Sequence, residues 1–284
     1  MEHSLYPEIL TYSIIDQKET IVIKYGGNAM VNDQIKLSVM KDIGKLHQAG
    51  KRVVVVHGGG PFINDILTTV KIQSEFIGGH RKTTPEAMKY IEMTLLGEVN
   101  SGLVTLLNNL GHRAVGISGK DGGLAKASRR YHHDGDSQID LGQVGNIDSI
   151  DPTILNDLLD KNYIPVVACV APSKEGHTFN INADMMAGAV AGAVDADDYI
   201  VLTDVDGLMM DKDDVDSLIQ ELAYDELAPL FDEVIVGGMI PKIESCQIAL
   251  DQGAKSARII NGTKEGTLVE AIINQNQTGT IISK

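Results

Sequence analysis

TIVIKYGG, residues 20–27, is the stretch that decides the fold. Residues 21–23 are consecutive apolar, β-branched residues, which predicts a strand buried on both faces because a half-buried strand would alternate apolar and polar side chains. Gly26 and Gly27 let the backbone turn tightly and bring its N–H groups close to a ligand. Lys24 adds a cation at the same end. The stretch therefore predicts an anion site at the carboxyl end of a parallel strand, with a plain turn as the alternative.

The same kind of apolar run recurs along the chain and predicts an α/β fold. Further strands are expected at residues 53–56, 114–117, 164–170, 199–202 and 257–260. Stretches with helical spacing separate most of them, and this alternation is typical of a parallel sheet with helices on its faces. We therefore expect a three-layer αβα sandwich with a mostly parallel central sheet, divided into two lobes.

The intervening segments predict helices and two hairpins. Asn32 is expected to cap a helix that ends near Gly50, and Thr84 to cap a long helix that ends near Asn109. Hairpins are expected at residues 72–83 and 125–149, and a helical stretch after Gly207. The domain boundaries follow: an N-terminal extension at 1–19, an N-terminal lobe at 20–175 and a C-terminal lobe at 176–284, with the seam in the polar segment 172–177.

Composition restricts the class of protein. The chain has 284 residues, enough for a full α/β core, and a formal net charge of −15 without a basic stripe, which argues against nucleic-acid binding. An anionic substrate would therefore need cations placed locally. No apolar run approaches the ~20 residues that span a bilayer, and the first residues lack the pattern of a secretory signal. We expect a cytoplasmic protein in which Cys169 and Cys246 are buried, reduced thiols.

Four glycine-bearing loops follow predicted strands: GGNA, HGGGP, SGKDGG and TDVDG. Loops after parallel strands emerge at one edge of the sheet, so we expect them to converge on a phosphate-handling cleft. Neither the dinucleotide pattern G-x-G-x-x-G nor the P-loop pattern G-x-x-x-x-G-K-[ST] occurs at these strand ends, which disfavours both classes of nucleotide site.

These loops belong to a longer series of motifs that resembles the amino acid kinase family. In order, the motifs are KYGG, HGGGP, GGHRKT, AVGISGKDGG, LGQVG, FNINAD, LTDVDG and GGMIPK. The likeness covers about residues 20–284, and the block 79–123 is more similar to the member that acts on N-acetyl-L-glutamate than to carbamate, aspartate or uridylate kinases. The resemblance implies transfer of the ATP γ-phosphoryl group to the side-chain carboxylate of that substrate, in arginine biosynthesis.

The resemblance also implies a role for individual residues. Lys24 and Lys242 would stabilise the transferring phosphoryl group, and Asp184 would hold both lysines in place. The implied acetylglutamate-binding residues, in the N-terminal lobe and at its edge, are Gly59, Gly60, Arg81 and Asn180. The implied nucleotide-binding residues are Gly26, Gly27, Asp204, Gly207, Gly238 and Met239, with ATP mainly on the C-terminal lobe. Mg²⁺ would arrive with ATP and be held mainly by phosphates, without a dedicated protein metal site.

The implied assembly is a homodimer through the long helix after Thr84, with a hexamer as the alternative. Hexameric, arginine-inhibited relatives have an N-terminal helix, which Pro7 interrupts here, so the sequence leaves open whether arginine is an effector.

The implied chemistry agrees with the residue types. A carboxylate acceptor has a pKa of about 4.3, so it is ionised near neutral pH and needs no general base. The obstacle is the approach of two anions, which two lysines and Mg²⁺ reduce. Arg81 can hold the substrate's α-carboxylate in a planar fork. Two alternatives stay open: a kinase of another acetylated or carrier-bound amino acid, and a non-catalytic sensor of the same fold, against which both lysines and Asp184 argue.

Overall fold

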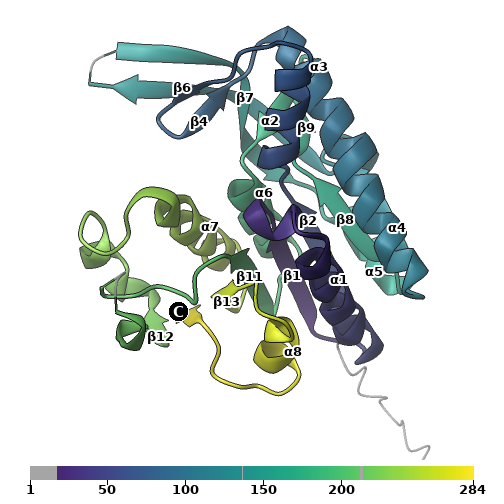
Figure 1. Ribbon diagram of the computed structural model, residues 1–284, viewed down its shortest axis with the longest axis vertical. Coiled ribbons are helices and arrows are strands. Elements are labelled where there is room, and N and C mark those ends of the chain that lie inside the picture. Colours follow the sequence, from purple (N-terminus) through teal and green to yellow (C-terminus); the bar gives the residue numbers. More distant parts are fainter. Residues whose placement is uncertain (1–17, 136, 212–213) are drawn as a thin grey trace, which may run out of the picture.

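A computed structural model describes residues 18–135, 137–211 and 214–284, so nearly all of the expected extension at 1–19 lies outside the described residues. Its centre is an eight-stranded sheet (Figure 1). In spatial order the strands are β12 (Glu221–Ala223), β14 (Thr280–Ser283), β13 (Ser256–Asn261), β11 (Asp198–Thr203), β1 (Thr20–Tyr25), β2 (Arg52–His57), β8 (Ile164–Ala168) and β5 (Ala114–Ser118). All neighbouring pairs are parallel except β13 and β14, which confirms the mostly parallel sheet.

Helices cover both faces of this sheet, which confirms the three-layer prediction. Alternate residues of one strand enter different cores: Ile21 and Ile23 pack with one set of helices, whereas Val22 packs with the other. The first set is α1 (Asp33–Gln48), α4 (Ser101–Asn109) and α8 (Thr267–Ile272). The second set is α5 (Thr153–Asp160), α6 (Ala183–Ala193) and α7 (Ile240–Asp251). Figure 1 shows β1 between α6 and α1.

Two smaller sheets lie beside the central one. The four-stranded sheet has the order β6 (Ala125–Asp134), β7 (Ser137–Ile150), β10 (Thr178–Ile181) and β9 (Val170–Pro172). The two-stranded sheet, here called the flap, consists of β3 (Glu75–Ile77) and β4 (His80–Lys82). Both hairpins expected from the sequence are therefore present. Because Thr178 pairs with Pro172 across an antiparallel β9–β10 turn, the expected lobe boundary near residue 175 falls inside a hairpin.

Helix starts agree with their capping residues. The Asn32 side chain accepts from the N–H groups of Gln34 and Ile35 at the start of α1, and Thr84 accepts from Ala87 N–H at the start of α3 (Pro85–Glu92). Helix α2 (Gly60–Thr69) begins directly after the glycine loop that follows β2.

The long helix after Thr84 changes its winding in the middle. Helix α3 continues without a break into a π-helical segment, Met93–Asn100, and then into α4. Buried residues of α3 contact α2 and β9, whereas Leu103 and Leu107 of α4 lie in the core beneath α1. The wider π-helical turns therefore let one helix serve two different cores.

The prediction of a helical stretch after Gly207 is wrong for the described part of residues 208–236. This region holds strand β12 and three short 3-10 turns, at Val215–Ser217, Tyr224–Glu226 and Ala228–Leu230. Leu222, whose spacing fits a helix, instead pairs with Ile282 at the sheet edge. Pro229 lacks the backbone N–H that a longer helix would need at this position. Of the helices in the described part of the chain, none is long and apolar enough to cross a membrane.

Candidate active site

A cavity of 210 Å³ lies at the carboxyl ends of β1 and β11. Its lining includes five of the residues singled out from the sequence: Lys24, Gly26, Gly27, Asp204 and Lys242. Strands β1 and β11 are neighbours in the parallel sheet, so their terminal loops meet at one edge. The loop after β5 does not join them, because β8 and β2 separate β5 from β1 and Lys120 of that loop pairs with Glu92 at 2.7 Å. Three of the four glycine loops thus follow the adjacent strands β11, β1 and β2.

Lys24 and Asp184 form a buried ion pair beside this cavity. Lys24 Nζ lies 3.0 Å from Asp184 Oδ1, and each residue is 7% exposed. Asp184 stands in the first turn of α6, where the side chain of Asn182 accepts from the Asp184 N–H at 2.8 Å and caps the helix. The end of β1 therefore positions Lys24, and the Asn182 cap positions Asp184. No residue that the structure describes donates a well-aligned hydrogen bond to Asp184 Oδ1, so the Lys24 charge is the main stabilisation seen for this atom.

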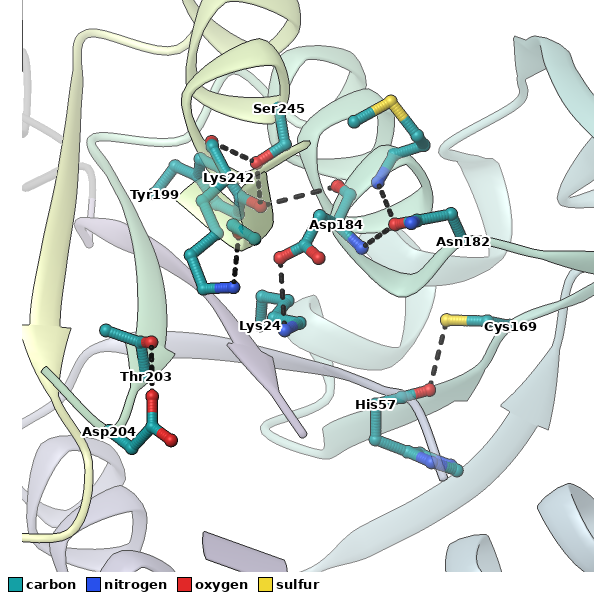
Figure 2. Close-up of polar contacts among 12 residues, drawn as sticks. Lys24, His57, Cys169, Asn182, Asp184, Tyr199, Thr203, Asp204, Lys242 and Ser245 are labelled. Atoms are coloured by element: carbon teal, nitrogen blue, oxygen red, sulfur yellow. Dashed lines mark hydrogen bonds and ion pairs between the residues drawn. The ribbon is translucent and has the colours of Figure 1, made fainter. Parts of the chain in front are cut away.

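Lys242 approaches the same cavity from α7 (Figure 2). It is the third residue of the helix and half-buried, and its Nζ donates to the carbonyl of Gly238 at 3.0 Å. Burial lowers the pKa of Lys242 below its ordinary value, while the charge of Asp184 acts in the opposite direction. Among the described residues no ion pair joins Lys242 to Asp184, so the carboxylate contacts only one of the two lysines that it was expected to hold.

The glycine loop after β1 keeps space open beside Lys24. Gly27 has a φ of +71°, a conformation that favours glycine. A Cβ on Gly26 would lie 3.5 Å from Lys24 Nζ, so a side chain here would stand directly against the ammonium. Asp204 lies across the cavity, next to Thr203, whose hydroxyl donates to the Asp204 carboxylate at 3.3 Å.

The other residues expected to bind nucleotide lie outside this lining. Gly238 contributes its carbonyl to Lys242, and Met239 ends the 3-10 turn Gly237–Met239 and packs against the core. Gly207 stands at the turn after β11, where the N–H of Leu208 donates to Thr280 Oγ1 at 2.8 Å. These contacts place Gly238 and Met239 directly before the helix that carries Lys242.

Three of the four residues expected to bind the acceptor lie at or over α2. Gly59 and Gly60 form its N-terminus, and a Cβ on Gly59 would come within 2.7 Å of Leu95 Cδ2. Arg81 of the flap donates to the Asn64 side chain of α2 at 2.6 Å and also to Ser74. The flap is therefore anchored over this helix. Asn180, half-buried in β10, stands two residues before the cap Asn182.

A second cavity, of 370 Å³, separates the flap from α7. Its lining includes Gly78 and Gly79 at the flap turn, Arg130 of β6, and Gly238 and Glu244 on the opposite side. In Figure 1 the β6–β7 hairpin and β4 lie on one side of this space and α7 on the other. The flap and the start of α7, whose third residue is Lys242, therefore border one cavity.

A buried histidine holds the loop after β2. His57 is 0% exposed; its Nδ1 contacts the carbonyl of Gly58 at 2.9 Å, and its Nε2 contacts Asn100 Nδ2, also at 2.9 Å. Because the Asn100 amide donates, the histidine is neutral with its proton on Nδ1. Burial lowers the pKa of His57 to about 4. The Cys169 thiol donates to the His57 carbonyl at 3.0 Å, and burial raises its pKa, as it does for Cys246.

Sequence reasoning missed several residues of the site. Thr203 lines the first cavity, and Asn64 holds Arg81. Thr203 could have been found as the last strand residue before the TDVDG turn. Asn64 could have been found as the residue one helical turn after Gly60. Asn100 carries no sequence signal, because its contact with His57 depends on the π-helical winding.

The comparisons agree with this geometry. The family model described as the amino acid kinase family matches residues 19–261. The chain is 44% identical over 276 residues to the acetylglutamate kinase of Synechococcus sp. (strain RCC307), covering 97% of this chain and 91% of that protein. It is 45% identical to the acetylglutamate kinase of Leptospira biflexa, covering 98% and 96%. The crystal structure of N-acetylglutamate synthase from Neisseria gonorrhoeae with coenzyme A and N-acetyl-glutamate matches at a TM-score of 0.81 and 25% identity, covering 94% of this chain and 59% of that one.

Proposed function

This chain belongs to the amino acid kinase family, and from that premise we propose that it is an acetylglutamate kinase. Its reaction is transfer of the γ-phosphoryl group of ATP to the side-chain carboxylate of N-acetyl-L-glutamate, which gives N-acetyl-L-glutamyl 5-phosphate and ADP. The observation that carries the proposal is the meeting of two lysines, Lys24 of β1 and Lys242 of α7, in one 210 Å³ cavity. Relatives that are 44% and 45% identical bear the same name.

The residues present would supply charge and position. A substrate carboxylate oxygen attacks the γ-phosphorus as the bond to the β-phosphate oxygen breaks, and no proton needs to move because the acceptor is already ionised. Lys24 and Lys242 neutralise charge on the transferring group, and the N–H groups of Gly26 and Gly27 donate to phosphate oxygens. Asp184 keeps the ammonium of Lys24 in place, as their 3.0 Å contact supports.

The donors around the cavity suit a Mg²⁺ ion that arrives on ATP. Asp204 and the Thr203 hydroxyl are oxygen donors at the cavity, whereas its other charged groups are the two lysines. A single carboxylate among cations fits a metal that keeps phosphate and water as most of its ligands. When bound, the ion would reduce the negative charge of the phosphates.

The acceptor would bind between the start of α2 and the flap. Gly59 and Gly60 offer a helix N-terminus to an anionic group. Arg81 offers a guanidinium fork that Asn64 already orients at 2.6 Å, and Asn180 adds an amide from β10. In this proposal the N-terminal lobe binds the acceptor and the C-terminal lobe binds ATP, in the cytoplasm.

The proposed assembly is a homodimer through the helix that runs from α3 to α4. The support for this assembly is the family resemblance, and Met93, which is 58% exposed at the start of the π-helical segment, would lie on the contact surface. Size-exclusion chromatography with light scattering, with and without arginine, would distinguish monomer, dimer and hexamer and would detect an arginine-dependent change.

The test of the proposed reaction is a side-by-side assay with N-acetyl-L-glutamate, L-glutamate, L-aspartate and a longer carrier-bound glutamate. ADP release is coupled to NADH oxidation, and hydroxylamine traps the acyl phosphate as a coloured hydroxamate. We expect both signals with acetylglutamate and a far lower kcat/KM with the others. A higher kcat/KM with free or carrier-bound glutamate would refute the substrate. Tight ATP binding with no turnover of any acceptor would favour the sensor.

A further inference from the structure

A chain of buried hydroxyl contacts lies next to Lys242, where β11, α6 and α7 meet (Figure 2). The Tyr199 hydroxyl of β11 donates to Ser245 Oγ of α7 at 3.0 Å, and Ser245 Oγ donates to the carbonyl of Lys242 at 2.7 Å. The same tyrosine hydroxyl lies 3.4 Å from the carbonyl of Asp184 in α6. Tyr199 and Ser245 are both 0% exposed. One tyrosine thus contacts the first turn of α6 and, through one serine, that of α7.

The two helices cross in direct backbone contact at the same level. A Cβ on Gly188 of α6 would lie 2.4 Å from the carbonyl oxygen of Ser245, so no side chain separates the helices there. Apolar side chains of both helices, including Met186 and Ile243, also share one buried cluster, and this non-directional packing holds the helices together. The hydroxyl contacts of Tyr199 and Ser245 are directional, and they add a specific constraint on how the helices are rotated relative to each other.

We propose that Tyr199 and Ser245 are positioning residues that hold the first turn of α7 against α6 and so set where the Lys242 ammonium stands relative to the Lys24–Asp184 pair. The inference rests on the proposed phosphoryl transfer. Neither residue lines the 210 Å³ cavity, so neither is a catalytic residue, and the shorter of the two Tyr199 contacts, at 3.0 Å, leads through Ser245 to Lys242. In the described part of the chain, the Lys242 side chain makes one hydrogen bond, of 3.0 Å, to the Gly238 carbonyl. A displacement of about 1 Å at a reacting centre can lower the rate by up to about 100-fold, so the hydroxyl contacts that hold the Lys242 backbone should affect the rate.

The contact is permanent across the working pH range. Burial raises the pKa of Tyr199 well above its ordinary value, so the hydroxyl keeps its proton and stays a donor. The nearby charge of Asp184 acts in the same direction. A loss of the hydroxyl should therefore lower activity by the same factor at every pH between 6 and 9.

The test compares Tyr199→Phe with Tyr224→Phe in the coupled assay. Tyr224 is a matched control, because its hydroxyl contacts the other end of the same helix, at Asp251 Oδ2, 2.8 Å away. We expect Tyr199→Phe to lower kcat about tenfold, with KM for both substrates within twofold, and Tyr224→Phe to leave both parameters unchanged. Ser245→Ala should match Tyr199→Phe, and the double variant should be no slower than either. An unchanged kcat, or a raised KM alone, overturns the inference.

Two further measurements separate positioning from general damage. In a Lys242→Ala background, Tyr199→Phe should have no additional effect, because its action passes through the absent side chain; an undiminished tenfold loss overturns the inference. The labelling rate of Lys242 by acetic anhydride, relative to an exposed lysine and followed by mass spectrometry, needs no turnover. It should rise about threefold in Tyr199→Phe, and an unchanged ratio refutes the inference. A wild-type chain without activity on acetylglutamate refutes the proposed function instead, and labelling then decides the positioning alone.

Discussion

Removing the charge of Asp184 tests the buried ion pair most directly. At 3.0 Å, two unit charges attract by about 5–6 kcal/mol at an effective dielectric constant of 20. Lys24 borders a cavity that admits water, which reduces the loss. Asp184→Asn keeps the shape and leaves the lysine charge buried without its partner. We therefore expect the free energy of unfolding to fall by about 3 kcal/mol, at the low end for a broken buried pair.

The assay is thermal unfolding followed by circular dichroism, without nucleotide. A loss of about 3 kcal/mol corresponds to a decrease of roughly 6–12 °C in Tm for a chain of this size. Asp33→Asn is the control, since Asp33 pairs with Lys36 at 2.8 Å while its side chain is 91% exposed, and exposed pairs contribute about 0–1 kcal/mol. In the double variant Lys24→Met, Asp184→Leu, stability should exceed that of Asp184→Asn, because no unpaired charge remains. The reasoning would be wrong if Asp184→Asn had the Tm of the wild type. It would also be wrong if the double variant had a lower Tm than Asp184→Asn.

Three further outcomes are expected. Lys242→Ala should lower kcat by at least about 100-fold with little change in KM, measured by steady-state kinetics, since its charge acts mainly in the transition state; a pure KM effect would mean ground-state binding. His57 has a folded-state pKa of about 4, below its pKa of about 6.5 in the unfolded chain. Between these two pH values the unfolded state binds more protons than the folded state. The free energy of unfolding should therefore fall by about 3 kcal/mol as the pH decreases from 6.5 to 4. Urea titrations at several pH values should show a shallower loss in His57→Asn, and an equal slope would contradict this. Cys169 and Cys246 are buried with raised pKa values, so Ellman's reagent should titrate neither in the native chain and both in guanidinium, and a fast native reaction would count against their burial.

Most of the fold follows from local sequence pattern. The run at 21–23 and the four valines at 53–56 specify strands buried on both faces, and the caps Asn32 and Thr84 mark helix starts that the structure confirms. These features depend on residues close together in the chain. The region after Gly207 could not be predicted in this way. Its apolar spacing suits a helix, but pairing with β14, which lies some 60 residues later at 280–283, decides its conformation.

The residues of the candidate site can likewise be divided into those that local sequence predicts and those that it does not. Lys24, Gly26 and Gly27 stand together in sequence and in space, so one motif identifies them. The meeting of Lys24 with Lys242 was inferred from the family resemblance, and the shared cavity agrees with it. The contacts behind the site escape both kinds of reasoning. Tyr199 looks like one more apolar strand residue, and only the crossing of α6 over α7 reveals what its hydroxyl touches.

The π-helical segment Met93–Asn100 has a consequence for how the gene can change. Its hydrogen bonds run from residue i to i+5, one residue further than in an α-helix, so each of its turns holds one extra residue. Deletion of one codon here should therefore restore α-helical winding and leave α4 in place. Insertion of one codon should instead rotate the following residues by about 100°, which would turn Leu103 out of the core beneath α1. A scan of codons 93–100 that compares single deletions with single insertions, selected for growth without arginine, should find deletions better tolerated than insertions.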